Sequence, residues 1–415
     1  MKNYISNLSV ILILLFFVII SCVEEIDFVE PNQTFESALV IDATITNEPK
    51  QQIIYLSRTY AFEEDGPNPE SGATVQIESD QGVYVFTETD SGTYISNITF
   101  AAQNNVNYQL IVKTNDNKIY SSTTLQLTHA TEIDNLYTAR ETNDYGVNGM
   151  AIYLDSYDPT NNSKFYRYTY EETYKIIAPD WTSQEIELVD ALTCEVNLRD
   201  RIQEEKICYN TVSSTNINLE STNGLTEDRV DRHLVRFIDS NDYILSWRYS
   251  IKVRQYIQSL EAYNYYDALK DFSGEGSLFS QTQPGFINGN ILSEDYPDEK
   301  VIGFFDVSTV SEKRIFFNFD DFYDGEPLPH YASGCYVLPI DQYTISGNCG
   351  GLISSLIADN VAYVHGASQV NDTTFLADGT MIIDLITIGP FYMVARACGD
   401  CTALGTNIVP EFWEE

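Results

Sequence analysis

Short runs of alternating apolar and polar residues fill residues 37–128. Leu39, Ile41 and Ala43 fall on one face of the first run, and similar runs recur along this segment. Alternation with a period of two places every second side chain on the same face of a β-strand. About seven strands at this spacing predict an antiparallel β-sandwich over residues 37–128, either immunoglobulin-like or transthyretin-like.

Residues 129–415 predict a second, larger β-rich domain that begins after a polar interval at His129–Gly149. Two extended runs lie on either side of a turn at residues 158–162, and they predict a long hairpin. Another extended run covers Tyr243–Ile257. Further strands are expected at residues 301–305, 314–319, 362–364, 374–376, 381–388 and 391–397.

One segment of the mature chain has a helical period. Ala262, Tyr265, Tyr266 and Leu269 follow i, i+3, i+4, i+7 spacing, which predicts a helix with one buried face. Ser259 precedes the run and is a favourable N-cap. The larger domain is therefore expected to contain one helix.

The first residues have the pattern of an export signal. Lys2 precedes an apolar run at Leu8–Ile20, which is too short to span a bilayer core but has the length of a signal-peptide segment. Ile19-Ile20-Ser21-Cys22 resembles the bacterial lipobox, so residues 1–21 are expected to be a lipoprotein signal peptide, with Cys22 lipidated. Two or more acyl chains give stable anchoring. The alternative is an ordinary signal peptide with an incidental cysteine.

Residues 22–36 lack periodicity and are expected to tether the first domain to the membrane. Glu24 and Glu25 follow the lipidated position and look like the signal that sends certain lipoproteins to the outer face of the outer membrane. The alternative is that this acidic pair only solvates the tether.

The chain has 23 Lys and Arg against 61 Asp and Glu, a formal net charge of −38. Such a surface repels phosphates, so nucleic acid partners are excluded, because their non-specific attraction depends on Lys and Arg. The same charge is compatible with binding cations or neutral sugars, although diffuse acidity more often serves solubility.

Six cysteines remain when Cys22 is set aside, and an even number in an exported chain is typical of disulfides. Cys194 and Cys208 are expected to pair, because the segment between them is polar, helix-like or loop-like, and closes a short loop. The other four, expected to pair among themselves, are Cys335, Cys349, Cys398 and Cys401.

Other candidate chemistry is weaker. Cys398-Gly399-Asp400-Cys401 has the spacing of a redox or zinc motif, but it lacks a βαβ context and a matching cysteine pair, so disulfides to Cys335 and Cys349 are favoured. No catalytic motif was found, which argues against an enzyme. Trp181, Trp247, Trp413 and the Tyr-rich segments are candidate stacking platforms for sugars or peptides, with core packing as the favoured interpretation.

An acidic cluster near residue 320 is a candidate calcium site formed by Asp320, Asp321 and Asp324. Carboxylate oxygens are the ligands that calcium prefers, but the spacing is not that of an EF-hand loop. A solvated turn is the favoured interpretation, and no other cofactor or metal is expected.

Several segments together resemble one bacterial lipoprotein family, that of domain of unknown function 4249. They are the lipobox, the β-rich start and the sequences SLEAYNYYDAL, GSLF, NGNI, VIGFFDVSTVSEKR and ARACGDCTALGTNIVPEFW. The most specific part is Cys398-x-x-Cys401 followed by Gly405-Thr406-Asn407, Pro410 and Phe412-Trp413. The family commonly has adjacent cysteines where this chain has Ala397-Cys398, so its disulfide arrangement is not carried over.

The resemblance has a functional implication because members of this family are often encoded beside TonB-dependent outer-membrane transporters. It implies a surface-exposed, non-catalytic accessory or substrate-binding lipoprotein that acts with such a barrel. Two alternatives stay open: an adhesin or structural surface lipoprotein, and a hydrolase whose site the sequence does not reveal.

Overall fold

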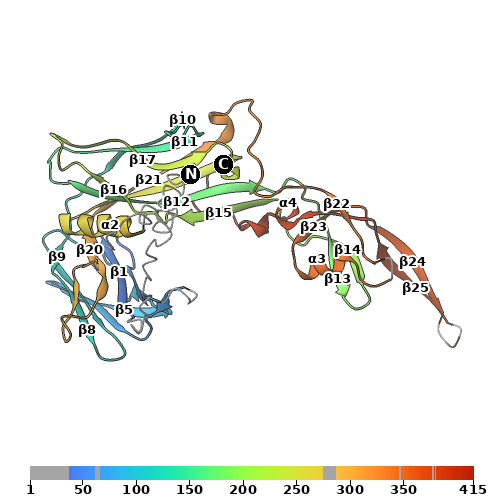
Figure 1. Cartoon of the computed structure of the whole chain (residues 1–415), viewed down its shortest axis with the longest axis horizontal. Coiled ribbons are helices and arrows are strands. Elements are labelled where there is room, and N and C mark those ends of the chain that lie inside the picture. Colours follow the sequence, from blue (N-terminus) through green and yellow to red (C-terminus); the bar gives the residue numbers. More distant parts are fainter. Residues whose placement is uncertain (1–36, 61–65, 274–286, 345–346, 376–377, 379) are drawn as a thin grey trace, which may run out of the picture.

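The computed structural model describes residues 37–415, apart from residues 61–65, 274–286, 345–346, 376–377 and 379. The described chain is mainly β and forms an elongated molecule (Figure 1). It has three parts, which we call the first sandwich, the second sandwich and the arm: the two sandwiches lie against each other at one end, and the arm extends toward the other end (Figure 1). Within the described ranges, no helix combines the length and apolarity that crossing a membrane requires.

The first sandwich is a single curved sheet wrapped around one core. Its strands alternate as predicted: Ile41, Ala43 and Ile45 point into the core, while the positions between them point out. The described pairings within residues 37–128 are antiparallel, as expected. The early strands are β1 (Leu39–Thr46), β2 (Ile53–Arg58), β3 (Asn68–Pro69), β4 (Thr74–Ser79), β5 (Gly82–Asp90), β6 (Thr93–Ser96), β7 (Asn107–Lys113), β8 (Ile119–Ser122) and β9 (Leu125–Gln126).

Two late strands complete this sheet. β19 (Ile291–Ser293) pairs antiparallel with β8, and β20 (Val301–Ser308) pairs parallel with β1. The predicted first domain, residues 37–128, therefore leaves out part of its own sheet. The reason is that strand pairing is set by contacts between residues far apart in sequence, which local alternation does not encode.

The second sandwich consists of a three-stranded sheet packed on a five-stranded sheet. Tyr166, Tyr168 and Tyr249 are fully buried between the layers, so the Tyr-rich strand mainly supplies core. The smaller sheet contains β10 (Ile133–Thr142), β11 (Asn148–Asp158) and β17 (Asp228–Asp239). The larger contains β12 (Phe165–Ile177), β15 (Ile207–Ser213), β16 (Asn218–Ser221), β18 (Arg248–Ile257) and β21 (Val310–Asn318).

Four expectations for this region were wrong. β11 and β12 do not form a hairpin, because the turn at residues 158–162 passes the chain from one layer to the other. The polar interval after His129 contains β10, whose outer face is solvated. Residues 194–208 contain strands rather than a helix or loop, and the run Tyr243–Ile257 begins with the 3₁₀-helix η1 (Tyr243–Leu245).

The predicted helix is present as α2 (Leu260–Ser273). The Ser259 hydroxyl accepts a hydrogen bond from the Ala262 N–H at 3.1 Å, as an N-cap does. Ala262 and Tyr265 are buried against Phe304 of β20, and α2 also contacts β12 of the second sandwich. The helix therefore packs against both sandwiches.

The arm extends from the second sandwich and has a small core of its own around Leu352, Phe391 and Met393 (Figure 1). It contains two short helices that the sequence pattern did not indicate. Its elements are β13 (Gln184–Asp190), β14 (Glu195–Asp200), β22 (Leu338–Ile340), α3 (Gly351–Ile357), β23 (Val361–His365), β24 (Ser368–Phe375), β25 (Met381–Ile388), β26 (Phe391–Ala395) and α4 (Arg396–Gly399). Two 3₁₀-helices complete the described elements, η3 (Phe319–Asp321) and η4 (Cys401–Ala403).

Candidate ligand-binding cleft

The predicted lipidation site Cys22 and the predicted export signal, Glu24 and Glu25, lie outside the described residues, as does the tether. The remaining predicted site residues can be located in the structure.

All six cysteines of the described residues form disulfides, as predicted, but the predicted partner of Cys194 was wrong. Cys194 pairs with Cys349, and Cys208 pairs with Cys401. The strand β14 starts just after Cys194 and runs for six residues, a span of about 20 Å in extended chain. It belongs to the arm, whereas Cys208 lies in β15 of the second sandwich, so proximity in sequence does not bring these sulfurs together.

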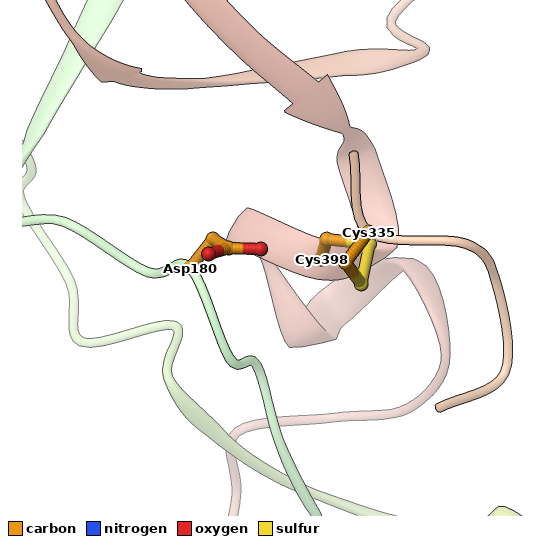
Figure 2. Close-up of side chains that lie close together, drawn as sticks. All are labelled: Asp180, Cys335 and Cys398. Atoms are coloured by element: carbon orange, nitrogen blue, oxygen red, sulfur yellow. A yellow bond between two sulfur atoms is a disulfide. The ribbon is translucent and has the colours of Figure 1, made fainter. Parts of the chain in front are cut away.

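The Cys398-x-x-Cys401 unit is divided between two disulfides. Cys398 pairs with Cys335, as favoured, while Cys401 pairs with Cys208 rather than with Cys349. Asp180 lies beside the Cys335–Cys398 bridge, and the three possible ligand atoms are within 4.8 Å of one another (Figure 2). Both sulfurs are consumed by the bridge, so they offer no thiolate to a metal.

The calcium candidates do not converge. Asp321 accepts hydrogen bonds from the backbone N–H of Asn318 at 2.7 Å and from its side-chain amide at 3.1 Å, and so caps η3. In the described part of the chain, the group of potential metal ligands that does cluster contains neither Asp320, Asp321 nor Asp324.

A polar cleft lies where the outward faces of the two sandwiches meet. Asp42 and Thr44 alternate with the buried residues of β1 and so point away from the first core. Arg167 of β12 and Arg254 of β18 occupy the corresponding outward positions of the second sandwich. These side chains line one cavity of about 290 Å³.

Arg167 is held by aromatic rings rather than by ion pairs. It lies directly opposite Tyr256 in the β12–β18 register. Its guanidinium lies over the rings of Tyr256 and Tyr266, at 4.4 and 4.5 Å from their centroids. Among the described residues Arg167 has no side-chain hydrogen bond or ion pair, and its Nε is a buried donor without a partner. Stacking of this kind fixes a guanidinium while leaving its edge donors free.

Asp42 is the acidic group of the cleft. It is an exposed residue that lines the cavity, with protein packed around it on β1 and β12. Desolvation by the surrounding protein raises the pKa of Asp42 above its ordinary value, and the charge of Arg167 opposes that rise. No hydrogen-bond donor from the described residues reaches the Asp42 carboxylate.

A second carboxylate, Asp306 of β20, lies behind the cleft and is fully buried. Gln258 and Ser308 donate hydrogen bonds to it, both at 2.6 Å. Burial raises the pKa of Asp306, while the Arg167 charge and these hydrogen bonds lower it in part. These two hydrogen bonds fix the position of the Asp306 carboxylate.

The other charges of the cleft neutralise one another. Glu48 accepts a hydrogen bond from Lys50 at 2.6 Å and forms an ion pair with Arg254. Burial alone would raise the pKa of Glu48, but these two cations outweigh it and hold the pKa below its ordinary value. Arg254 also lies 3.6 Å from Glu312. Asp42 and Arg167 are thus the charged groups of the cleft without such a partner in the described structure.

Hydrogen bonds join the two walls of the cleft. Thr128 donates a hydrogen bond to the Ile257 carbonyl at 2.8 Å and accepts one from the Thr309 N–H at 2.9 Å. The side chain of Asn47 accepts a hydrogen bond from the Val310 N–H at 2.8 Å. These contacts join the first sandwich directly to β18 and β21, so the cleft is held by main-chain and side-chain hydrogen bonds.

Sequence reasoning missed this site. Asp42 and Arg167 are single polar residues at outward positions of strands, and such positions are normally solvated. The available signal was the scarcity of cations in a chain of net charge −38, combined with the position of Arg167 between tyrosines. Only the approach of the two sandwiches makes the two side chains neighbours.

Comparison with known proteins gives one family. The model of the family described as Domain of unknown function (DUF4249) matches residues 23–314, which covers the first sandwich and the second sandwich as far as the first half of β21. No curated protein matches the chain.

Proposed function

The chain belongs to the domain of unknown function 4249 family, and on this premise we propose that it is a surface-exposed outer-membrane lipoprotein that binds substrate for a TonB-dependent outer-membrane transporter. Lipidation at Cys22 would hold it at the membrane, and Glu24 and Glu25 would direct it to the outer face.

The observation that supports this proposal most is the cleft between the two sandwiches. Binding sites for small molecules commonly lie at domain interfaces, where a few polar groups converge in a concave space. Here an unpaired acid and an unpaired base converge in a cavity of about 290 Å³. A protein that presents such a cleft beside a transporter would raise the local concentration of substrate at the barrel.

The strong negative charge also fits this setting. A chain with net charge −38 is repelled by anionic lipid head groups, so the body of the protein would stand away from the membrane surface. The lipid at Cys22 would then be its main attachment, and the cleft would stay open to the medium.

Affinity purification from native membranes tests the partnership. The full-length tagged protein, extracted in mild detergent, should co-purify with a TonB-dependent barrel that mass spectrometry identifies. The matched control is Cys22→Ala, which should fractionate with soluble proteins and lose the barrel. Recovery of the lipidated protein without any barrel would contradict the proposal, and adhesion of whole cells that depends on the protein would favour an adhesin instead.

A further inference from the structure

Arg167 has the properties of a carboxylate receptor. A guanidinium offers paired N–H donors along its edge, which match the two oxygens of a carboxylate. The faces of this guanidinium are covered by Tyr256 and Tyr266, so its edge is the part left to bind. Its Nε is buried without an acceptor, whereas Nη1 and Nη2 are accessible and have no acceptor among the described residues, so these two are the donors that a ligand can reach.

Asp42 has the complementary properties. It lines the same cavity as Arg167, and the two charges influence each other without forming an ion pair. The Asp42 carboxylate receives no hydrogen bond from the described protein and keeps surface toward the cavity. A ligand ammonium group would supply both donors and the opposite charge.

The rest of the cleft does not compete for such a ligand. Lys50 and Arg254 are already paired with Glu48 and Glu312, and the Asp306 carboxylate already accepts hydrogen bonds from Gln258 and Ser308. Arg167 is therefore the cation of the cleft with free donors, and Asp42 is the carboxylate with free acceptors, which favours a molecule that carries both a carboxylate and an ammonium group. A ligand with a single charge would leave one of the two groups desolvated and unpaired, which lowers affinity.

The size of the cavity limits the ligand further. A volume of about 290 Å³ is at the small end of ligand sites and suits an amino acid or a short peptide. The exposed ring of Tyr55 and the side chain of Ile53 provide apolar surface in the same lining, where a ligand side chain can pack.

We propose that the cleft binds a small zwitterion, an amino acid or short peptide, with its carboxylate on Arg167 and its ammonium on Asp42. This inference rests on the proposed function, since it names the substrate class of the same cleft.

Isothermal titration of the purified full-length protein in detergent tests the proposal. The probes are free amino acids and alanine-containing dipeptides, compared with their N-acetylated forms, which lack the ammonium, and their amides, which lack the carboxylate. At least one zwitterion should bind saturably. The affinity of each single-charge analogue should be lower by a factor of at least about ten. If no zwitterion of the panel binds, the proposal is overturned.

Variants identify the groups involved. Arg167→Met should weaken the zwitterion about tenfold or more but leave the binding of the amide nearly unchanged. Asp42→Asn should weaken the zwitterion without affecting the N-acetylated form. Arg229→Met is the matched control, because Arg229 also lies over a tyrosine ring, that of Tyr157, but outside the cleft.

The variant Arg167→Lys separates the loss of ligand contacts from a folding defect, because it keeps the positive charge but lacks the paired donors. It should fold like the wild type and still bind the zwitterion more weakly. Unchanged affinity in the folded Arg167 and Asp42 variants would contradict the proposed ligand contacts. Co-purification of a barrel by a protein that binds no zwitterion would leave the proposed function standing and reject this ligand class alone.

Discussion

Asp158 shows how one side chain organises a junction between layers. It lies at the end of β11, where the chain turns toward β12, and only 3% of the residue is exposed. One carboxylate oxygen accepts hydrogen bonds from the N–H and hydroxyl of Thr160, and the other accepts the N–H groups of Asn162 and Ser163. Burial alone would raise the pKa of Asp158, but these hydrogen bonds outweigh it and hold the pKa well below its ordinary value of 3.8.

Asp158→Asn is therefore expected to lower the free energy of unfolding at neutral pH by about 1.5–3 kcal/mol. The Asn amide nitrogen would face N–H groups that need an acceptor. Because the folded-state pKa is depressed, the advantage of the wild type is complete above pH ~4 and declines as the pH falls below that value. Urea unfolding at several pH values measures this advantage of the wild type.

The control for this prediction is Asp144→Asn, in the exposed turn between β10 and β11. It should leave stability within about 0.5 kcal/mol of the wild type. A difference between wild type and Asp158→Asn that grew as the pH fell below ~4 would contradict the assigned hydrogen bonds.

At the scale of elements, β20 decides how the two sandwiches are joined. It closes the first sheet by pairing with β1, and the next strand, β21, already belongs to the second sandwich. Gly303 permits the close approach of β20 to β1, because a Cβ at this position would lie 2.3 Å from the Ile41 carbonyl oxygen. A glycine here is thus required by the packing of backbone on backbone.

Gly303→Ala should destabilise the first sandwich by about 1–3 kcal/mol, because the strand must move to relieve the clash. Hydrogen exchange of the β1 and β20 amides measures this, and protection should fall in these strands before it falls in the arm. Gly224→Ala is the matched control, since a Cβ there meets no atom within 4 Å. Equal stability of the two variants would show that β20 does not pack as described.

At the scale of the whole molecule, disulfides tie distant parts of the chain together. The Cys208–Cys401 bridge spans 193 residues and fixes the C-terminal segment to β15 of the second sandwich. Trp413 then packs edge-on against Tyr209, with ring centroids 4.9 Å apart. The Cys194–Cys349 bridge spans 155 residues and closes the arm.

Removing both cysteines of the Cys208–Cys401 bridge by substitution with Ala should lower the free energy of unfolding by about 2–5 kcal/mol. Thermal unfolding of the double variant measures the loss. Mass spectrometry of peptides from the unreduced protein checks the pairing itself, and a peptide that joins Cys194 to Cys208 would contradict it.

Local patterns in the sequence were sufficient for the β class, the faces of the early strands, the helix α2 with its Ser259 cap, and the use of all six cysteines in disulfides. Each depends on side-chain period or composition within a short segment, which the folded context does not reverse. The tertiary structure alone decided that β19 and β20 complete the first sheet, which sulfurs meet, and that Asp42 and Arg167 share a cleft. These outcomes depend on contacts between residues far apart in the chain, and one strand pattern is compatible with many partners until the whole core is packed.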